Sequence, residues 1–157
     1  MHDRDNEDRI RASALAAELS DDQIGALAAV TEVHDLEDGA VLIKEGDVDD
    51  RLFAVVSGGL EVGLLSQQSG SWTSFVRLRP GEIAGELGFL QDARRTATVR
   101  ASGPTTVVSL SRSSFESLLG SDPLLTYRVM RAILRSVHQV VSNMNSQHAH
   151  LINYISG

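Results

Sequence analysis

The chain has 157 residues, 42% of them hydrophobic and 22% charged, which is enough for one globular domain with a buried core. Its formal net charge of −7 argues against a domain whose main partner is nucleic acid, because phosphate binding needs clustered Lys and Arg, and against adhesion to an anionic membrane. The absence of cysteine excludes disulfides, thiolate metal sites and thiol chemistry.

The sequence offers no apolar segment for a leader or a membrane span. The first ten residues, MHDRDNEDRI, are polar and acidic where a signal peptide would need an apolar stretch. No run of 18 apolar residues occurs along the chain. We therefore expect a cytoplasmic protein with no membrane partner.

Residues 1–32 are expected to form a helical lead-in. The first dozen residues alternate charges of both signs and are either loose or the start of a helix. Apolar residues recur at helical spacing over Ile10–Leu19, which predicts a helix there. Ser20 stands three residues before Gln23, a capping-box pattern that predicts a second short helix ending near Ala29.

Between residues 33 and 120 the pattern changes to short β-branched runs separated by glycine turns. The expected strands are Val41–Ile43, Leu52–Val56, Leu60–Val62, Phe75–Leu78, Ala97–Val99 and Thr106–Val108. Short strands at this spacing, with no long helices between them, predict an antiparallel sandwich, barrel or roll rather than a parallel α/β sheet. Trp72 is expected in a loop or on an edge strand, where an exposed indole could serve a partner contact.

The helical period returns after Ser111. The apolar residues between Phe115 and Leu119 predict a short helix ending at Gly120, and Ser121–Pro123 signals the start of a long helix within residues 121–157. Apolar or seam positions alternate along it in steps of four and three, at Met130, Leu134, Val137, Val141, Met144, His148, Leu151 and Ile155. Two interpretations stay open: a face packed on the β core, or a seam that pairs with a second copy.

The most informative segment for function is residues 80–101, PGEIAGELGFLQDARRTATVRA. Its Gly85-Glu86-Leu87-Gly88 run opens a helical turn, whose first N–H groups are unpaired and can face an anion. The two glycines permit close approach of a ligand to the backbone.

Arg95 follows nine residues after Glu86 and precedes the small residues Thr96 and Ala97. The planar guanidinium of an arginine matches phosphate oxygens, and a threonine hydroxyl beside it adds a donor. A carboxylate near a phosphate site would repel the ligand, so Glu86 makes sense there if it binds a ribose hydroxyl. One phosphate and one ribose hydroxyl together describe a cyclic nucleotide.

This segment closely resembles the phosphate-binding cassette of the cyclic-nucleotide-binding domain family, which includes bacterial catabolite activators and the regulatory subunits of cAMP-dependent protein kinase. The family pattern is Gly-Glu-Leu-Ala/Gly followed by Arg-Ser/Thr/Ala-Ala-Thr, and it stands here as Gly85–Gly88 and Arg95–Thr98 with no insertion. The resemblance covers roughly residues 36–143, including residues 41–47 and 52–62. It implies one α+β domain: an antiparallel, jelly-roll-like β-roll flanked by short N-terminal helices and a long C-terminal helix.

The resemblance also implies roles for individual residues. Arg95 would pair with the cyclic phosphate, Glu86 would accept the ribose 2′-hydroxyl, and neighbouring backbone groups would complete the cradle. The residues expected to bind ligand are Gly85, Glu86, Leu87, Gly88, Arg95, Thr96 and Ala97. Threonine at position 96 leaves cGMP open beside cAMP, which is favoured as the commoner bacterial ligand.

The long helix is expected to cover the base. In the catabolite activators two polar residues of this helix contact adenine, in part across the dimer. An ungapped match through Phe115 and Pro123 places Val140 and Val141 at these positions, and with Val137 they are expected to form an apolar lid. Such a lid would weaken strict adenine selectivity.

Two features of the cassette can also be interpreted without a role in ligand binding. Glu86 and Arg95 could form a salt bridge in a domain that has lost ligand binding. Arg94 stands where many relatives carry proline, and it either adds positive potential at the pocket or is solvated.

The leading hypothesis is a regulatory sensor, not an enzyme, that binds a cyclic nucleotide and transmits binding through the C-terminal helix to an unknown partner protein. A truncated or atypical transcription regulator of the catabolite-activator type would need a helix-turn-helix after that helix, and only about a dozen residues follow Asn145. A roll with a non-nucleotide ligand is the third alternative.

Catalysis, cofactors and metals are not expected. No Walker motif, nucleophile elbow or acid pair in a catalytic setting occurs in the sequence. His138, His148 and His150 lack acidic or Cys partners at metal-binding spacing, so surface or seam positions are expected for them.

Overall fold

Two antiparallel four-stranded sheets form the centre of the fold, in a computed structural model that describes residues 2–91 and 93–156 and the side chains of residues 3–91 and 93–143. The first sheet has the order β1-β8-β3-β6 and the second β2-β7-β4-β5. The strands of the first sheet are β1 (Glu32–Leu36), β8 (Thr105–Ser111), β3 (Arg51–Ser57) and β6 (Ile83–Ala84). Those of the second are β2 (Val41–Ile43), β7 (Thr98–Ala101), β4 (Leu60–Leu65) and β5 (Trp72–Leu78).

The expected antiparallel roll is confirmed, and all six predicted strands occur. Two strands have no counterpart among the predicted runs. In β1 every residue is exposed or half-buried, so its apolar pattern is weak, and β6 is only two residues long and lies inside the cassette. Trp72 begins the edge strand β5, in keeping with the loop or edge position expected for it.

The N-terminal lead-in is helical but divided differently from the prediction. Helix α1 (His2–Arg11) is followed by a short 3-10 helix, η1 (Ala14–Ala16), so the single helix predicted over Ile10–Leu19 is wrong. The Ser13 hydroxyl donates to the Ile10 carbonyl at 2.7 Å, and the Ala14 N–H donates to the Gly81 carbonyl at 2.8 Å. These bonds replace the helical ladder after α1.

The predicted capping box is confirmed at the start of α2 (Asp21–Ala28). The Gln23 N–H donates to Ser20 Oγ at 3.3 Å, and the Ser20 N–H donates to Gln23 Oε1 at 3.0 Å. Each bond satisfies a backbone donor that the helix itself cannot. The start of this helix is therefore determined locally.

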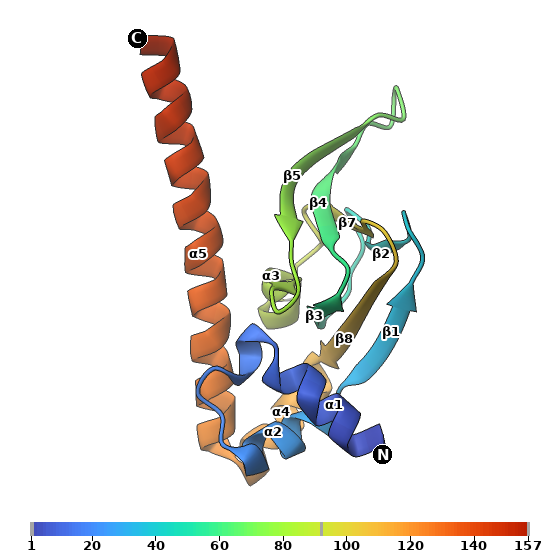
Figure 1. The fold of residues 1–157 in the computed structure, drawn as a ribbon, viewed down its shortest axis with the longest axis vertical. Helices are drawn as coiled ribbons and strands as arrows, with labels where there is room; N and C mark the ends of the chain where they lie inside the picture. Colours follow the sequence, from blue (N-terminus) through green and yellow to red (C-terminus); the bar gives the residue numbers. More distant parts are fainter. Residues whose placement is uncertain (1, 92, 157) are drawn as a thin grey trace.

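Two apolar clusters hold the elements together. One lies inside the roll and includes Phe53, Leu60 and Val107. The other joins the N-terminal helices and the first sheet to α4 (Arg112–Ser121) and α5 (Pro123–Ser156), through residues such as Leu27 and Phe115. Figure 1 shows α5 running along one side of the roll, starting beside α2 and α4 and continuing past α3.

The apolar residues of α5 face two environments. Met130 and Val137 are partly buried and pack on the second cluster, as the first interpretation of the seam requires. Leu134 and Val141 are 62% and 48% exposed, respectively. The side chains of the remaining seam positions, Met144, His148, Leu151 and Ile155, lie outside the described residues, as does that of His150.

Candidate functional site

The Gly85–Gly88 run of the cassette begins where β6 ends. Gly85 has φ 86°, a left-handed conformation that favours glycine, and it precedes the short helix α3 (Glu86–Leu90). A Cβ at Gly85 would lie 2.9 Å from both the Arg51 carbonyl oxygen and Arg95 Nη1. A Cβ at Gly88 would overlap Arg95 Nη1. The two glycines therefore make room for the Arg95 guanidinium.

Arg95 is buried, with 6% of its surface exposed. Its Nη1 donates to the Gly85 carbonyl at 2.9 Å and its Nη2 to the Arg51 carbonyl at 2.6 Å. Its ion-pair partner is Asp49, at 3.8 Å from Nη2 to Oδ1. Its Nε is buried and has no hydrogen-bond partner within the described part of the chain. An unpaired N–H on a buried cation is costly, and an anionic acceptor would satisfy it.

The electrostatics of the cassette depend on burial. Burial lowers the pKa of the Arg95 guanidinium, while the nearby charge of Asp49 opposes that shift. Burial raises the pKa of the Glu86 carboxyl, and the charge of Arg95 partly counters the rise. The ion pair of Arg95 is with Asp49 rather than with Glu86, so the expected alternative of a Glu86–Arg95 salt bridge is not the arrangement in this structure.

The turn between β2 and β3 positions the end of the cassette. The Gly46 N–H donates to the Arg95 carbonyl, and the Arg95 N–H donates to the Asp47 carbonyl, both at 2.8 Å. Arg94 is exposed, and its Nη1 donates to the Gly46 carbonyl at 3.0 Å. These bonds fix the backbone on both sides of the Arg95 side chain.

A cavity of about 370 Å³ lies beside the cassette, within the ~300–1,000 Å³ range of small-molecule sites. All seven residues predicted to bind ligand line it: Gly85, Glu86, Leu87, Gly88, Arg95, Thr96 and Ala97. Its remaining walls are mainly apolar and come largely from strands, with Ile43, Val62, Val76, Leu78, Ile83 and Val99 among them. Arg94 also lines the cavity. One polar wall and several apolar walls suit a ligand with an anionic end and a flat apolar end.

The three valines expected to form the lid occupy different places. Val140 lines the cavity, Val137 packs on the core cluster, and Val141 is 48% exposed.

Sequence reasoning also missed Asp49 and Arg51, which hold Arg95 from outside the cassette. The alternating apolar residues of β4 and β5 are a signal that could have located the apolar walls.

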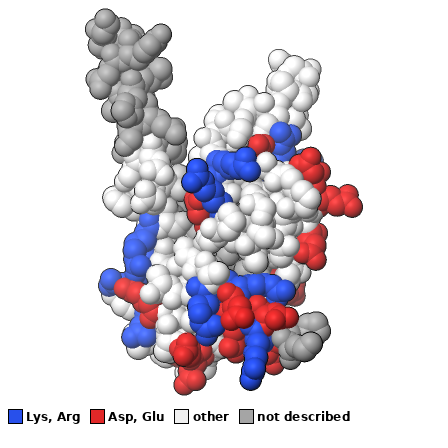
Figure 2. Space-filling model, in the orientation of Figure 1, with Lys and Arg blue, Asp and Glu red and all other residues white. Residues whose placement is uncertain are grey.

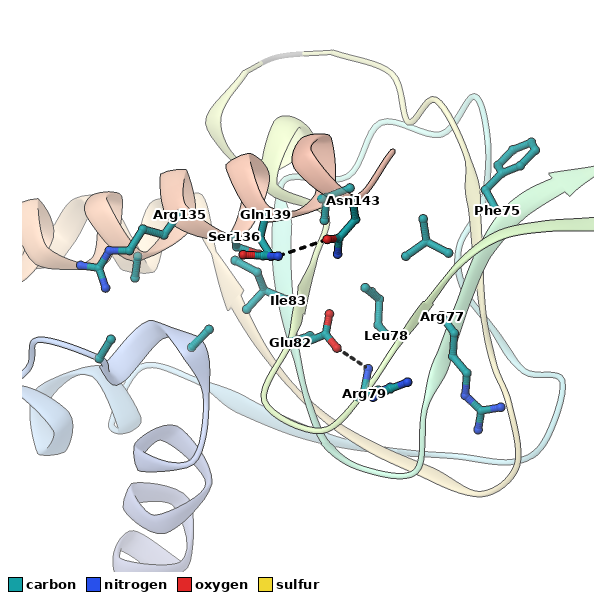
Figure 3. Close-up of a pocket in the computed structure, with 15 residues that line it drawn as sticks. Phe75, Arg77, Leu78, Arg79, Glu82, Ile83, Arg135, Ser136, Gln139 and Asn143 are labelled. Carbon is teal, nitrogen blue, oxygen red and sulfur yellow. Dashed lines mark hydrogen bonds between the residues drawn. The ribbon is translucent and has the colours of Figure 1, made fainter. Parts of the chain in front are cut away.

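A second hollow, a groove of about 710 Å³, adjoins the cavity along α5. The two share four wall residues, Val76, Leu78, Ile83 and Val140. Figure 3 shows polar side chains of α5 on one side of the groove and the segment from Phe75 to Ile83 on the other. Space beside the cassette therefore continues toward a polar face of the long helix.

Other functional features can be assessed for the described residues. Within residues 3–91 and 93–143, no three His, Asp or Glu side chains cluster so as to hold a metal ion. In the helices that the structure describes, none is long and apolar enough to cross a membrane. On the face drawn in Figure 2, basic and acidic side chains are intermixed, especially over the N-terminal helices.

The sequence of this chain is similar to those of known proteins. The family model described as "Cyclic nucleotide-binding domain" matches residues 33–122. A curated relative from Mucor circinelloides f. lusitanicus, a cAMP-dependent protein kinase regulatory subunit, is 33% identical over 109 residues. That match covers 69% of this chain and 24% of the relative, so this chain spans about a quarter of the relative's length.

Solved structures share the fold. A cyclic nucleotide-binding domain from Methylobacillus flagellatus KT has a TM-score of 0.82 at 21% identity, covering 92% of this chain and 83% of that one. The regulatory domain of Toxoplasma gondii PKA, crystallised with cAMP, has a TM-score of 0.62 at 28% identity, covering 73% of this chain and 43% of that one. With more than half of its residues matched by the family model, this chain belongs to the cyclic nucleotide-binding domain family.

Proposed function

We propose that this chain is a regulatory sensor domain that binds a 3′,5′-cyclic nucleotide, with cAMP as its principal ligand, and that it is not an enzyme. The observation that carries the proposal is the buried Arg95, whose Nε lacks a partner among the described residues and which lines a cavity of suitable size. In this proposal Arg95 binds the cyclic phosphate and Glu86 accepts the ribose 2′-hydroxyl. The backbone of Gly85, Leu87, Thr96 and Ala97 completes the cradle.

The choice of cAMP is supported by the relatives. The Mucor relative is named a cAMP-dependent protein kinase regulatory subunit, and the Toxoplasma domain was crystallised with cAMP. The exposed Thr96 lines the same cavity, which keeps cGMP as the alternative ligand. A roll with a non-nucleotide ligand, or a regulator of the catabolite-activator type, remains the alternative function.

Calorimetric titration with cAMP and cGMP tests the proposal. Ligand-free wild-type protein should bind at least one of them, and Arg95→Ala should lower the affinity by about 100-fold or more, because a buried phosphate would lose its charged partner. Arg11→Ala is the matched control, since Arg11 lies on α1 and pairs only with exposed carboxylates in the described structure. If ligand-free wild-type protein binds neither nucleotide, the proposal is wrong.

We further propose that α5 transmits the binding signal to a partner protein. Arg131 and Arg135 pair with Glu18 at 3.1 and 3.0 Å, which ties this part of α5 to the lead-in, whereas Val140 contacts the ligand cavity. A nucleotide that binds one position of α5 better than another would shift the helix. Amide hydrogen exchange over residues 136–143 should slow when nucleotide binds, and unchanged exchange would contradict this role.

The outer face of α5 supports a homodimer as a second proposal. Tyr127, Leu134 and Val141 are 57%, 62% and 48% exposed and recur every seven residues, the spacing of a helix-pairing seam. Wild-type protein should therefore sediment as a dimer, and Leu134→Glu should produce monomers. Wild-type protein that stays monomeric at high concentration would refute the proposal.

A further inference from the structure

The groove of about 710 Å³ follows the edge of a β-strand. Residues 75–79, four from β5 and one from the turn after it, all line the groove. Alternate side chains of a strand point to opposite faces of the sheet, so a hollow lined by consecutive residues lies along the backbone edge of the strand. Strand β5 is the last in the order β2-β7-β4-β5, and this edge is therefore its outer one.

The outer edge of β5 is open for pairing. Within the described residues, the ladder of β5 joins it to β4 alone. The remaining main-chain hydrogen bonds of the described chain do not involve residues 72–78. A bulge after Ser74 interrupts the ladder, so the regular part of the edge runs from Val76 to Leu78. An open edge presents a row of N–H and C=O groups that can pair with a further strand.

Helix α5 forms the other wall of the groove. Its lining residues lie on one helix face: Ala132, Arg135, Ser136, Gln139, Val140 and Asn143. The side chains of Ser136, Gln139 and Asn143 can both donate and accept hydrogen bonds, and Figure 3 shows them opposite the strand side of the groove. An extended peptide segment beside β5 would therefore find polar partners on its second edge as well.

The charged side chains of the groove favour an acidic occupant. Three arginines line it, Arg77, Arg79 and Arg135, although the chain as a whole has a formal net charge of −7. Glu82 is the one carboxylate among the lining residues. Arg135 is shared with Glu18 at 3.0 Å, whereas Arg77 and Arg79 are exposed on the strand side of the groove. Guanidinium groups pair well with carboxylates, so these two arginines suit acidic side chains.

We propose that this groove binds an extended acidic segment of a partner protein, which adds to β5 as a further strand of the second sheet. Recognition by strand addition takes affinity from main-chain bonds and specificity from alternate side chains. Arg77 and Arg79 are two residues apart, so two alternate carboxylates of the segment can lie beside them as cross-strand neighbours. The proposal goes beyond the proposed function, because it needs no nucleotide at Arg95.

The position of the groove suits the partner of a sensor. The groove and the cavity share four wall residues, among them Val140 of α5. A partner segment held between β5 and α5 would therefore contact the same part of the helix that lines the cavity.

Fluorescence anisotropy with synthetic peptides of eight residues tests the proposal. A labelled peptide that alternates glutamate and threonine should bind the wild-type protein at least about tenfold more tightly than one that alternates lysine and threonine, because like charges would face Arg77 and Arg79. Arg79→Glu should weaken binding of the acidic peptide by about tenfold. Arg11→Glu is the matched control, since Arg11 lies on α1 outside the groove, and it should bind as the wild type does.

Peptide N-methylation separates strand addition from simple charge attraction. The N–H groups of alternate residues point to the same edge of an extended peptide, so methylating the glutamates blocks one edge and methylating the threonines blocks the other. One methylated peptide should lose about tenfold or more in affinity, because several main-chain bonds to β5 are removed, and the other should lose much less.

Three results would overturn the proposal. They are no binding of the acidic peptide by wild-type protein, equal losses for the two methylated peptides, and dissociation of a protein dimer by the acidic peptide, which would assign the groove to a second copy of this chain. Titration of the same protein with cAMP tests the proposed function separately, so failure of one proposal leaves the other standing.

Discussion

The two walls of the cavity beside Arg95 are held in opposite ways. On the cassette wall, Arg95 is buried, two of its nitrogens donate to backbone carbonyls, and its main chain is bonded to the β2–β3 turn. On the α5 wall, the half-buried Val140 lines the cavity, while Gln139 and Asn143, which line the adjoining groove, are exposed and bond to each other. The first wall is organised before ligand arrives, and the exposure of the second leads us to expect that it adjusts more easily. A ligand that bridges a fixed wall and an adjustable wall can convert its binding energy into movement of the helix.

After the loss of Arg95 itself, the largest effect should come from disturbing the fixed wall without replacing a ligand-binding side chain. Gly88→Ala places a methyl group where Arg95 Nη1 lies, so the guanidinium must move, and cAMP affinity should fall by about 30-fold or more. Gly120→Ala is the matched control, because its Cβ would meet nothing within 4 Å, and it should bind as the wild type does. Calorimetric titration measures both, and equal affinities for the two variants would contradict a wall organised around Arg95.

An effect of intermediate size is expected from replacing the Glu86 carboxyl. The replacement should weaken cAMP binding, but it should also remove a pH-dependent loss of folding stability. Glu86→Gln should weaken cAMP binding about tenfold, because a neutral acceptor replaces a charged one. Burial raises the pKa of Glu86 above the ordinary value of 4.5, so the folded chain keeps this proton to a higher pH than the unfolded chain does.

It follows that the free energy of unfolding of the wild type should fall as the pH rises through the titration of Glu86. The Glu86→Gln variant should not show this decrease in the free energy of unfolding, because it has no carboxyl group at position 86. Denaturant unfolding at a series of pH values measures it. Parallel pH profiles for the two proteins would show that burial does not penalise the Glu86 carboxylate.

The smallest effect should come from Arg94, which lines the cavity but is exposed. Arg94→Gln should lower cAMP affinity about two- to threefold at low salt, because exposed charges contribute weakly, and the difference should vanish at high salt. Affinities measured across a salt series provide the test, with Arg11→Gln as the control. A large effect that persists at high salt would mean that Arg94 contacts the phosphate directly.

The contrast between the cassette wall and the α5 wall also explains which parts of the site could be predicted from the sequence. The cassette residues from Gly85 to Ala97 are close in the sequence, and a local pattern of glycines, Glu86 and Arg95 was sufficient to place them on one wall. Asp49 and Arg51 hold Arg95 from more than forty residues away, and no local pattern pairs them with it.

The α5 wall was harder to predict because it depends on how the helix is rotated against the roll. Successive residues of a helix differ by about 100° in direction, so an alignment that is correct to within one residue still selects the wrong side chains. Val140, expected as a lid residue, does line the cavity, but its neighbours on the groove are Ser136, Gln139 and Asn143, not Val141. Tertiary packing of Val137 on the core determines that rotation.

The central claim is that the buried Nε of Arg95, which has no hydrogen-bond partner among the described residues, donates to a cyclic phosphate when the nucleotide binds. Side-chain NMR tests this claim most directly. The Arg95 Nε–H resonance can be assigned as the one missing from the ¹H–¹⁵N spectrum of Arg95→Lys. On addition of cAMP to the wild type, this resonance should move downfield and its exchange with water should slow, as expected for a charge-assisted hydrogen bond. Saturation with cAMP that leaves the Arg95 Nε–H resonance unmoved would contradict the account.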